Sequence, residues 1–173
     1  MLIDLDYSVG LIESLKTDDD LFLKGTMKFM AMERLEKFVG EEPTIPRTVR
    51  HDLESFFYVF LVGCVEYEVV PQSKTHNFDR WCTNDIENNL AHKMSCIIKF
   101  EFWVLKHFTP SFYYLKDLAK SLRTILFSQD GQYITTPIDC SSMYDEMIEA
   151  FNKSIEQITE RSILNNTIKS RRQ

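Results

Sequence analysis

The residues that most directly suggest chemistry lie at the start of the chain, where Asp4 and Asp6 are separated by one apolar residue. Hard divalent cations such as Mg²⁺ take carboxylate oxygens as ligands. The alternation of apolar and acidic residues over positions 1–5 predicts a short strand with one buried face. We expect any divalent cation bound by these two acids to be held loosely and independently of nucleotide.

A second candidate is a set of nitrogen and sulfur ligands, His76, Cys82, His92 and Cys96. Zinc sites usually show tight paired spacings of such residues, and this set has that spacing only in part. His92 and Cys96 are four residues apart, which places them on one side of a helix. We interpret them as residues at the edge between surface and core rather than as zinc ligands.

Motifs for nucleotide binding and hydrolysis are not found in the sequence. The five glycines lie far apart, so none of them forms a G-x-G-x-x-G or G-x-x-x-x-G-K-S/T phosphate loop. There is no G-x-S-x-G or H-E-x-x-H, and His51 and Asp52 are helix neighbours whose side chains do not face each other. The residues alone therefore indicate no complete catalytic site.

Length and composition indicate one compact domain. The chain has 173 residues, of which 44% are hydrophobic and 27% charged, as in globular proteins. Its net charge is −6, and an acidic surface repels nucleic acid phosphates and anionic lipid headgroups. We therefore expect neither nucleic acid nor a membrane as a partner.

The location that we expect is intracellular, either cytoplasmic or nuclear. The longest apolar run, 56–65, is about half of the roughly 20 residues that a membrane-spanning helix needs. The first residues carry two carboxylates and no basic segment, so they do not resemble a secretory signal. The four cysteines are scattered, and we expect them to be reduced thiols that are mostly buried.

The elements that must position any site are predicted to be mainly α-helical. Residues 7–24 show no sustained period and predict a long loop, and a helical turn fits 29–38. From about 51 to 67 the chain is apolar almost all round, which predicts a buried central helix with no face for water. Amphipathic helices with apolar stripes should pack around it. The stripes are Ile86, Leu90, Met94, Ile97 and Ile98; then Phe112, Leu115, Leu118, Leu122 and Ile125; then Met143, Met147, Phe151, Ile155 and Ile158.

Three segments together resemble the fungal-type protein kinases. Residues 25–35, G-T-M-K-F-M-A-M-E-R-L, resemble the stretch that closes the activation segment in that family. Residues 2–6, L-I-D-L-D, resemble its version of the Asp-Phe-Gly triad, and residues 51–59, H-D-L-E-S-F-F-Y-V, resemble the start of its long central helix. Order and spacing agree across the three segments, and the likeness extends over roughly residues 1–160.

The resemblance implies a carboxy-terminal kinase lobe over 1–160, followed by a frayed basic tail over 161–173. Within it, Asp4 would be the carboxylate that holds Mg²⁺ against ATP. Thr26 would lie in the loop that receives the substrate peptide. Glu33 would be the glutamate that pairs with a buried arginine, which the sequence does not identify, and Asp52 would be a structural organiser. Met32 and Asp6 depart from the usual kinase pattern, which has proline and glycine there.

The resemblance also implies that this chain alone does not transfer phosphate. A kinase needs a Gly-rich loop, a strand lysine, its glutamate partner and the catalytic-loop Asp and Asn, all upstream of the Asp-Phe-Gly triad. Only three residues precede Asp4 here. We expect ATP and Mg²⁺ as cofactors of a full-length family member and none for this chain alone.

Three functional interpretations remain open at this point. The chain is a fragment of a Ser/Thr kinase, or a stand-alone pseudokinase-like module that binds a protein partner or peptide, or a helical bundle with a chance likeness. Transcript sequence upstream of Met1 would separate the first two. A peripheral 51–67 helix would support the third.

Overall fold

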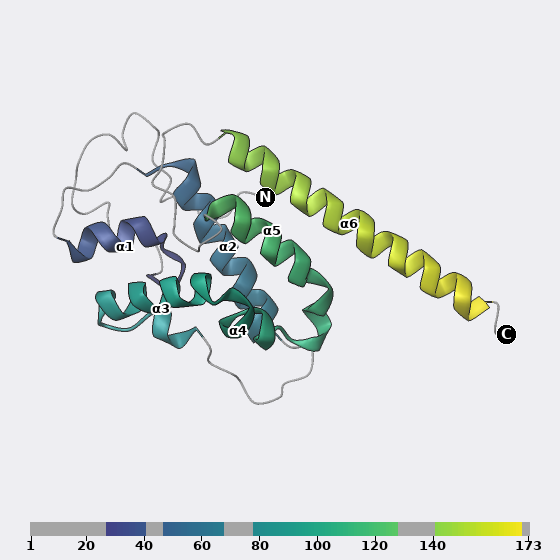
Figure 1. Cartoon of the computed structure of the whole chain (residues 1–173), viewed down its shortest axis with the longest axis horizontal. Helices are drawn as coiled ribbons and strands as arrows, with labels where there is room; N and C mark the ends of the chain where they lie inside the picture. The colour runs from purple at the N-terminus through teal and green to yellow at the C-terminus, as the bar shows by residue number, and fades with distance from the viewer. Residues whose placement is uncertain (1–26, 41–46, 68–77, 128–140, 171–173) are drawn as a thin grey trace, which may run out of the picture.

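The computed structural model describes residues 27–40, 47–67, 78–127 and 141–170, and these are mainly helical, as the sequence predicts (Figure 1). The elements in chain order are η3 (Met27–Phe29), α1 (Met32–Val39), α2 (Val49–Glu66), η4 (Asp79–Trp81), α3 (Ile86–Ile98), α4 (Phe100–Trp103), η5 (Leu105–His107), η6 (Pro110–Leu115), α5 (Lys116–Leu126) and α6 (Ser141–Ser170). The η elements are 3₁₀ helices. The strand predicted for 1–5 and the loop predicted for 7–24 lie outside the described residues.

The long helix α2 begins at a capping box. The Thr48 side chain accepts from the backbone N–H of His51, and the His51 ring accepts from the backbone N–H of Thr48. Histidine here takes the place that Glu or Gln has in most such boxes. The helix ends where Tyr67 turns to an extended conformation. This local chemistry fixes the start of the helix two residues before the predicted one.

Helix α2 is central, with α1 and α3 on one side and α5 and α6 on the other (Figure 1). Its buried apolar residues are Phe57, Tyr58, Leu61, Cys64 and Val65. The expectation that the whole helix is shielded from water is wrong, because Phe56 is 50% exposed and Val59 48% exposed. Among the described residues, Phe56 has an edge-on ring contact with Phe151 of α6, with centroids 5.9 Å apart.

Aromatic rings form the core around the middle of α2. Phe57 stacks on Phe100 at a centroid distance of 6.0 Å and lies 6.1 Å from Phe127. Tyr58 meets Trp81 edge-on at 5.1 Å, and Trp81 lies 4.2 Å from Phe78. Each large ring removes a large apolar area from water, so this cluster supplies a large part of the hydrophobic stabilisation.

Helices α3 and α5 pack largely with the predicted stripes, but Ile98 of the α3 stripe is 51% exposed. Asp85 caps α3 by accepting from the backbone N–H of Asn88. The helix contacts α1 with a face that includes buried Asn89 and Lys93, which an apolar stripe does not predict. On α5, Leu118, Leu122 and Leu126 are all buried.

The last helix, α6, packs beside α5 along its first part and extends past the rest of the molecule (Figure 1). Met147 and Ser154 are buried, but Ile155 of the predicted stripe is 59% exposed. The helix runs on to Ser170, where a frayed tail from 161 was expected. The predicted division at residue 160 therefore falls within one helix, and it stays a prediction as a domain boundary.

Candidate functional site

Two of the four predicted site residues can be placed in the structure. Asp4 and Thr26 lie outside the described residues. Glu33 lies in the first turn of α1, and Asp52 lies in the first turn of α2. The structure does not bring these two acids into one group, because Glu33 is nearly buried whereas Asp52 faces solvent. Their roles remain predictions.

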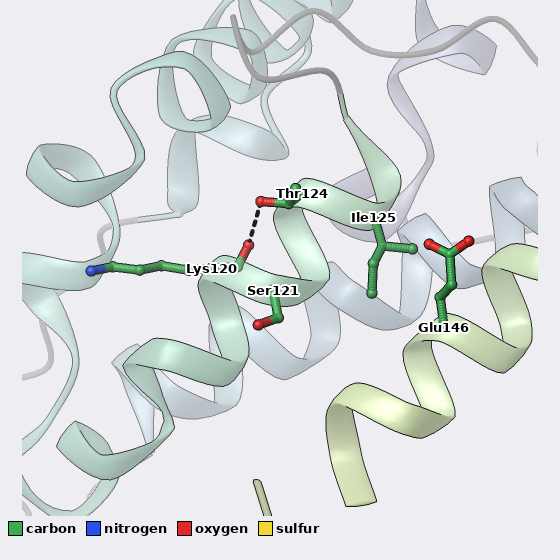
Figure 2. A pocket seen from close by; sticks show the side chains of 5 residues that line it. All are labelled: Lys120, Ser121, Thr124, Ile125 and Glu146. Carbon is green, nitrogen blue, oxygen red and sulfur yellow. Dashed lines mark hydrogen bonds between the residues drawn. The ribbon is translucent and has the colours of Figure 1, made fainter. Parts of the chain in front are cut away.

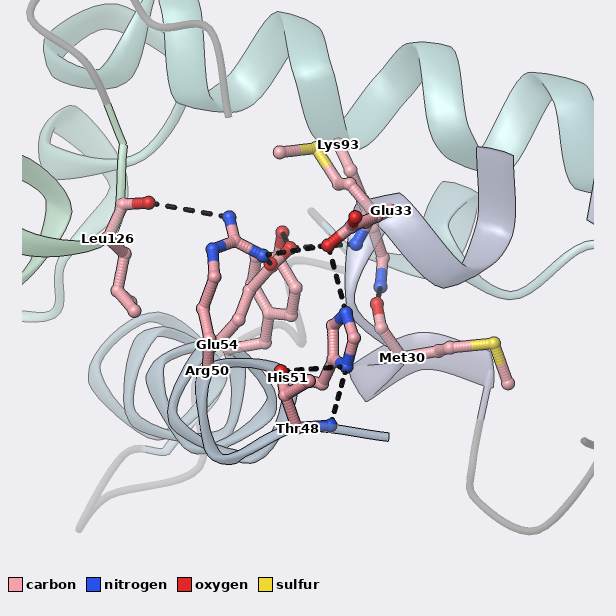
Figure 3. A network of polar contacts seen from close by, with 10 residues as sticks. Met30, Glu33, Thr48, Arg50, His51, Glu54, Lys93 and Leu126 are labelled. Atoms are coloured by element: carbon pink, nitrogen blue, oxygen red, sulfur yellow. Dashed lines mark hydrogen bonds and ion pairs between the residues drawn. The ribbon is translucent and has the colours of Figure 1, made fainter. Parts of the chain in front are cut away.

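The best-defined polar group in the described residues surrounds Glu54, whose carboxylate is fully buried on α2 (Figure 3). Its Oε1 accepts from the backbone N–H of Met32 at 2.7 Å and from the Tyr58 hydroxyl at 2.6 Å. Its Oε2 accepts from Arg50 Nη1 at 2.8 Å, one helical turn earlier. A buried charge is tolerated only with such partners, so Glu54 is the residue on which this group depends.

Glu33 joins the same group from α1 (Figure 3). Its Oε2 lies 3.0 Å from Nε2 of His51 and 3.9 Å from Nη1 of Arg50. Arg50 also donates to the backbone oxygen of Leu126 at 3.4 Å, and its guanidinium lies over the Phe127 ring at 5.8 Å. Arg50 is thus the buried arginine nearest to Glu33 in the described residues, a position that the sequence alone does not identify.

His51 has its proton placed by its neighbours. The backbone N–H of Thr48 donates to Nδ1 at 3.0 Å, so in the neutral ring the proton lies on Nε2 and is donated to Glu33. Burial lowers the pKa of His51, and the Glu33 carboxylate opposes that shift. At a pH above its usual pKa the imidazole is therefore neutral, and its hydrogen bonds connect the N-terminal cap of α2 to α1.

Lys93 approaches the same segment from α3. Its ammonium donates to the backbone oxygen of Met30 at 2.6 Å and to that of Met27 at 3.3 Å. It also lies 4.4 Å from the Tyr58 ring centroid and 5.5 Å from that of Trp81. Burial lowers the pKa of Lys93 to about 7, and Glu54 acts in the opposite direction.

Taken together, these contacts hold residues 27–33 between α2 and α3. The contacts are directional hydrogen bonds to backbone groups, which fix where a chain segment lies as well as how stable it is. Burial and Glu54 raise the pKa of Tyr58 well above its usual value, so its hydroxyl stays a donor. The hydrogen bonds of this group position the backbone of residues 27–33.

Asp52 is a surface residue. Arg47 Nε donates to its Oδ1 at 2.7 Å, and both side chains are about half exposed. The pair closes the turn that leads into α2. No buried partner of a catalytic loop is seen for Asp52 among the described residues.

The candidate zinc ligands are not gathered in the described part of the chain. No group of three or more His, Cys, Asp or Glu is placed there to hold a metal ion. His76 is outside the described residues, Cys82 is exposed and Cys96 is buried. Burial raises the pKa of Cys64 to about 12 and that of Cys96 to about 11, as expected of unreactive thiols.

Sequence reasoning assigned no role to Arg50, Glu54 and Lys93, although Glu54 lies in the segment 51–59 that carries the resemblance. A signal for the first two was present, since an arginine and a glutamate four apart in an apolar helix can pair only inside the protein. Tyr58 continues that spacing by a further four residues. The contacts of Lys93 could not be derived from local spacing, because its acceptors are backbone oxygens more than sixty residues away in the chain.

Comparison with protein families bears on the first part of the chain. Residues 1–64 match a family model described as fungal protein kinase. This match confirms the resemblance for the segment that contains Glu33, α1 and most of α2, whereas the likeness up to about residue 160 stays a prediction. Searches of the curated proteins and of the solved structures found no match. Among the described residues, no helix is long and apolar enough to cross a membrane.

Proposed function

We propose that the chain is the helical, peptide-binding part of a fungal-type Ser/Thr protein kinase-like domain. By itself, in this proposal, it does not transfer phosphate. The family match over residues 1–64 supports a kinase-like domain. In this proposal the chain corresponds to the carboxy-terminal lobe, its partner is a protein or peptide substrate, and it acts in the cytoplasm or nucleus. ATP and Mg²⁺ would be cofactors of a complete domain.

The observation that carries the proposal is the buried attachment of residues 27–33. Met32 is bound through its backbone to Glu54, and Met30 through its backbone to Lys93. These residues lie in the stretch that resembles the end of an activation segment, beside which a kinase presents its substrate peptide. A platform for a peptide has to be rigid, because phosphoryl transfer depends on positioning.

The second half of the proposal, inactivity of this chain alone, rests on what phosphoryl transfer requires. Catalysis in kinases comes from a Gly-rich loop, a phosphate-binding lysine, metal ions and a catalytic Asp acting together. The 173 residues contain no glycine-rich loop of this kind, and Asp4 is the one metal-binding residue that the resemblance supplies. A single carboxylate cannot provide the electrostatic stabilisation that the transition state needs.

Calorimetric titration of the purified chain with Mg²⁺-ATP tests the inactive state, and we expect no saturable heat. Micromolar affinity would overturn this part of the proposal. If upstream residues with a catalytic Asp are joined to the chain and activity appears, Asp4→Ala should abolish it. Activity that survives Asp4→Ala would contradict the role carried over to Asp4.

A stand-alone pseudokinase-like interaction module is the second candidate. It is favoured by exposed apolar side chains on two neighbouring helices, Phe56 and Val59 of α2 and Tyr144 and Ile148 of α6. Patches of this kind often mark protein interaction sites. Transcript sequencing upstream of Met1 separates the two candidates, because a reading frame that continues upstream into kinase motifs favours the first.

A further inference from the structure

A shallow groove between α4 and α5 has a composition unlike the rest of this acidic chain. It has a volume of about 500 Å³, and its lining includes Lys99, Lys120 and Arg123 with a single carboxylate, Glu101. The whole segment from α4 to α5 carries the cations Lys99, Lys106, Lys116, Lys120 and Arg123 against the acids Glu101 and Asp117. A local positive surface on a molecule of net charge −6 attracts anionic groups to this place.

The cations of the groove differ in how they are held. Arg123 is fixed, since its Nε donates to the backbone oxygen of Ile97 at 2.7 Å and its guanidinium lies over the Phe100 ring at 5.8 Å. In the described part of the chain, its Nη atoms make no hydrogen bond. A guanidinium that is already oriented loses little side-chain entropy when it binds a carboxylate.

Lys120 is the more adaptable member. It forms an ion pair with Glu101 at 3.1 Å, but the Glu101 side chain is 78% exposed, so the pair is weak and can be replaced. Figure 2 shows that Lys120 extends away from Glu146 of α6, although both line a second hollow between α5 and α6. The ammonium is therefore directed to the α4 side, toward the groove.

Apolar side chains stand exposed at the same groove. Ile98 is 51% exposed and Phe102 56% exposed, and Trp103 meets the Phe102 ring edge-on at 5.0 Å. Lys106 lies over the Phe102 ring, with its ammonium nitrogen 5.0 Å from the ring centroid. Aromatic residues and arginine are enriched at the centres of protein interfaces, and lysines alone are not.

We propose that this groove binds an acidic protein segment that also carries aromatic or aliphatic residues. Carboxylates of the segment would meet Arg123, Lys99 and Lys120, and its apolar side chains would cover Ile98 and Phe102. Nucleic acid fits less well, because a phosphate backbone needs a long continuous track of cations and would meet Glu101 here. The groove is independent of the peptide platform at residues 27–33, so either proposal can fail without the other.

The test uses random copolymers, which sample many spacings of charged and apolar residues at once. Binding of a fluorescent copolymer of glutamate and tyrosine is measured by anisotropy at low salt, beside polyglutamate and a copolymer of lysine and tyrosine. We expect the glutamate–tyrosine polymer to bind best and the lysine polymer not to bind this groove. Failure of the glutamate–tyrosine polymer to bind the wild-type chain would overturn the proposal.

Two sets of variants locate the binding. Lys99→Glu with Lys120→Glu should weaken it about tenfold, as expected for the reversal of two surface charges. Lys153→Glu with Arg161→Glu, which makes the same charge change on exposed positions of α6, should have less than about a twofold effect. Equal losses of affinity in the two double variants would contradict binding at the groove. Phe102→Ala should weaken binding of the tyrosine copolymer and leave polyglutamate unchanged.

Two further outcomes would assign the groove to another occupant. A single-stranded oligonucleotide that binds more tightly than the acidic copolymer, and loses affinity in the Lys99→Glu, Lys120→Glu pair, would make it a nucleic acid site. Self-association in sedimentation that the same pair abolishes would make it a contact between two copies, with the acidic α6 as the occupant. Either result overturns the proposal of an acidic partner segment.

Discussion

The N-terminal half of α2 buries charged and polar side chains, whereas its C-terminal half buries apolar ones. Glu54 accepts from the backbone N–H of Met32, His51 is hydrogen-bonded to Glu33 of α1, and Arg50 donates to Glu54. Phe57 and Leu61 are held by contact with other apolar side chains. The hydrophobic contacts have no preferred direction and chiefly stabilise, whereas the hydrogen bonds specify which neighbour lies where. One helix thus combines a stabilising part with a positioning part.

The largest effect is expected at the centre of the polar half. Glu54→Ala should lower the free energy of unfolding by about 5 kcal/mol, because Arg50 stays buried without its closest carboxylate. The Met32 N–H and the Tyr58 hydroxyl also lose their acceptor. Urea denaturation followed by circular dichroism measures the change. Should Glu54→Ala fail to fold, Glu54→Gln keeps the volume and allows the comparison.

A matched double variant separates stabilisation from positioning. Arg50→Met with Glu54→Leu removes both charges, and such replacements are often neutral or stabilising. We therefore expect a stability within about 2 kcal/mol of the wild type. Hydrogen exchange at the Met32 amide should nevertheless be faster, because its acceptor is gone. Unchanged exchange at Met32 would show that the polar half does not position residues 27–33.

The apolar half should respond nearly as strongly, but by a different mechanism. Phe57 is fully buried, so Phe57→Ala should cost about 3–5 kcal/mol through lost contacts and a cavity. Phe60 is partly buried and Phe60→Ala should cost less, while half-exposed Phe56 gives a control of the same chemistry. Thermal unfolding measures all three. An unchanged melting temperature for Phe57→Ala would refute the central position of α2.

Lys93 gives the polar group a dependence on pH. Burial lowers its folded-state pKa to about 7 from 10.5 in the unfolded chain, so between these values the unfolded state binds the extra proton. Stability should therefore rise as pH increases from about 7, by at most about 1.4 kcal/mol per pH unit. Below pH 7 both states are protonated and this dependence ends.

The measurement is urea denaturation from pH 7 to 8.5. In the folded state His51 is neutral and the buried thiols stay protonated over this range. In Lys93→Met the rise with pH should be absent. A Lys93→Met variant that keeps the full slope would show that another group is responsible.

The sequence predicts the apolar half of α2 well and the polar half poorly. Continuous apolar residues identify a buried helix, since no other environment suits them. The pattern cannot tell that Phe56 and Val59 remain half exposed, because this depends on which elements cover each face. It also cannot place Arg50 and Lys93, since their partners come from distant parts of the chain. The resemblance located Glu33, and only the fold brought Arg50 beside it.

The smallest effect is expected at Asp52, two residues before Glu54 on the same helix. Its ion pair with Arg47 is about half exposed, and pairs of this kind contribute about 0.2–1 kcal/mol. Its place in the first turn adds a small favourable interaction with the helix dipole. Asp52→Ala should therefore lower the free energy of unfolding by about 1 kcal/mol or less, and the difference should shrink in high salt.

Because Asp52 and Glu54 share a helix and a charge, burial is the main difference between them. A cost for Asp52→Ala that approaches that of Glu54→Ala would show that Asp52 has a buried partner, as the organising role carried over from kinases requires.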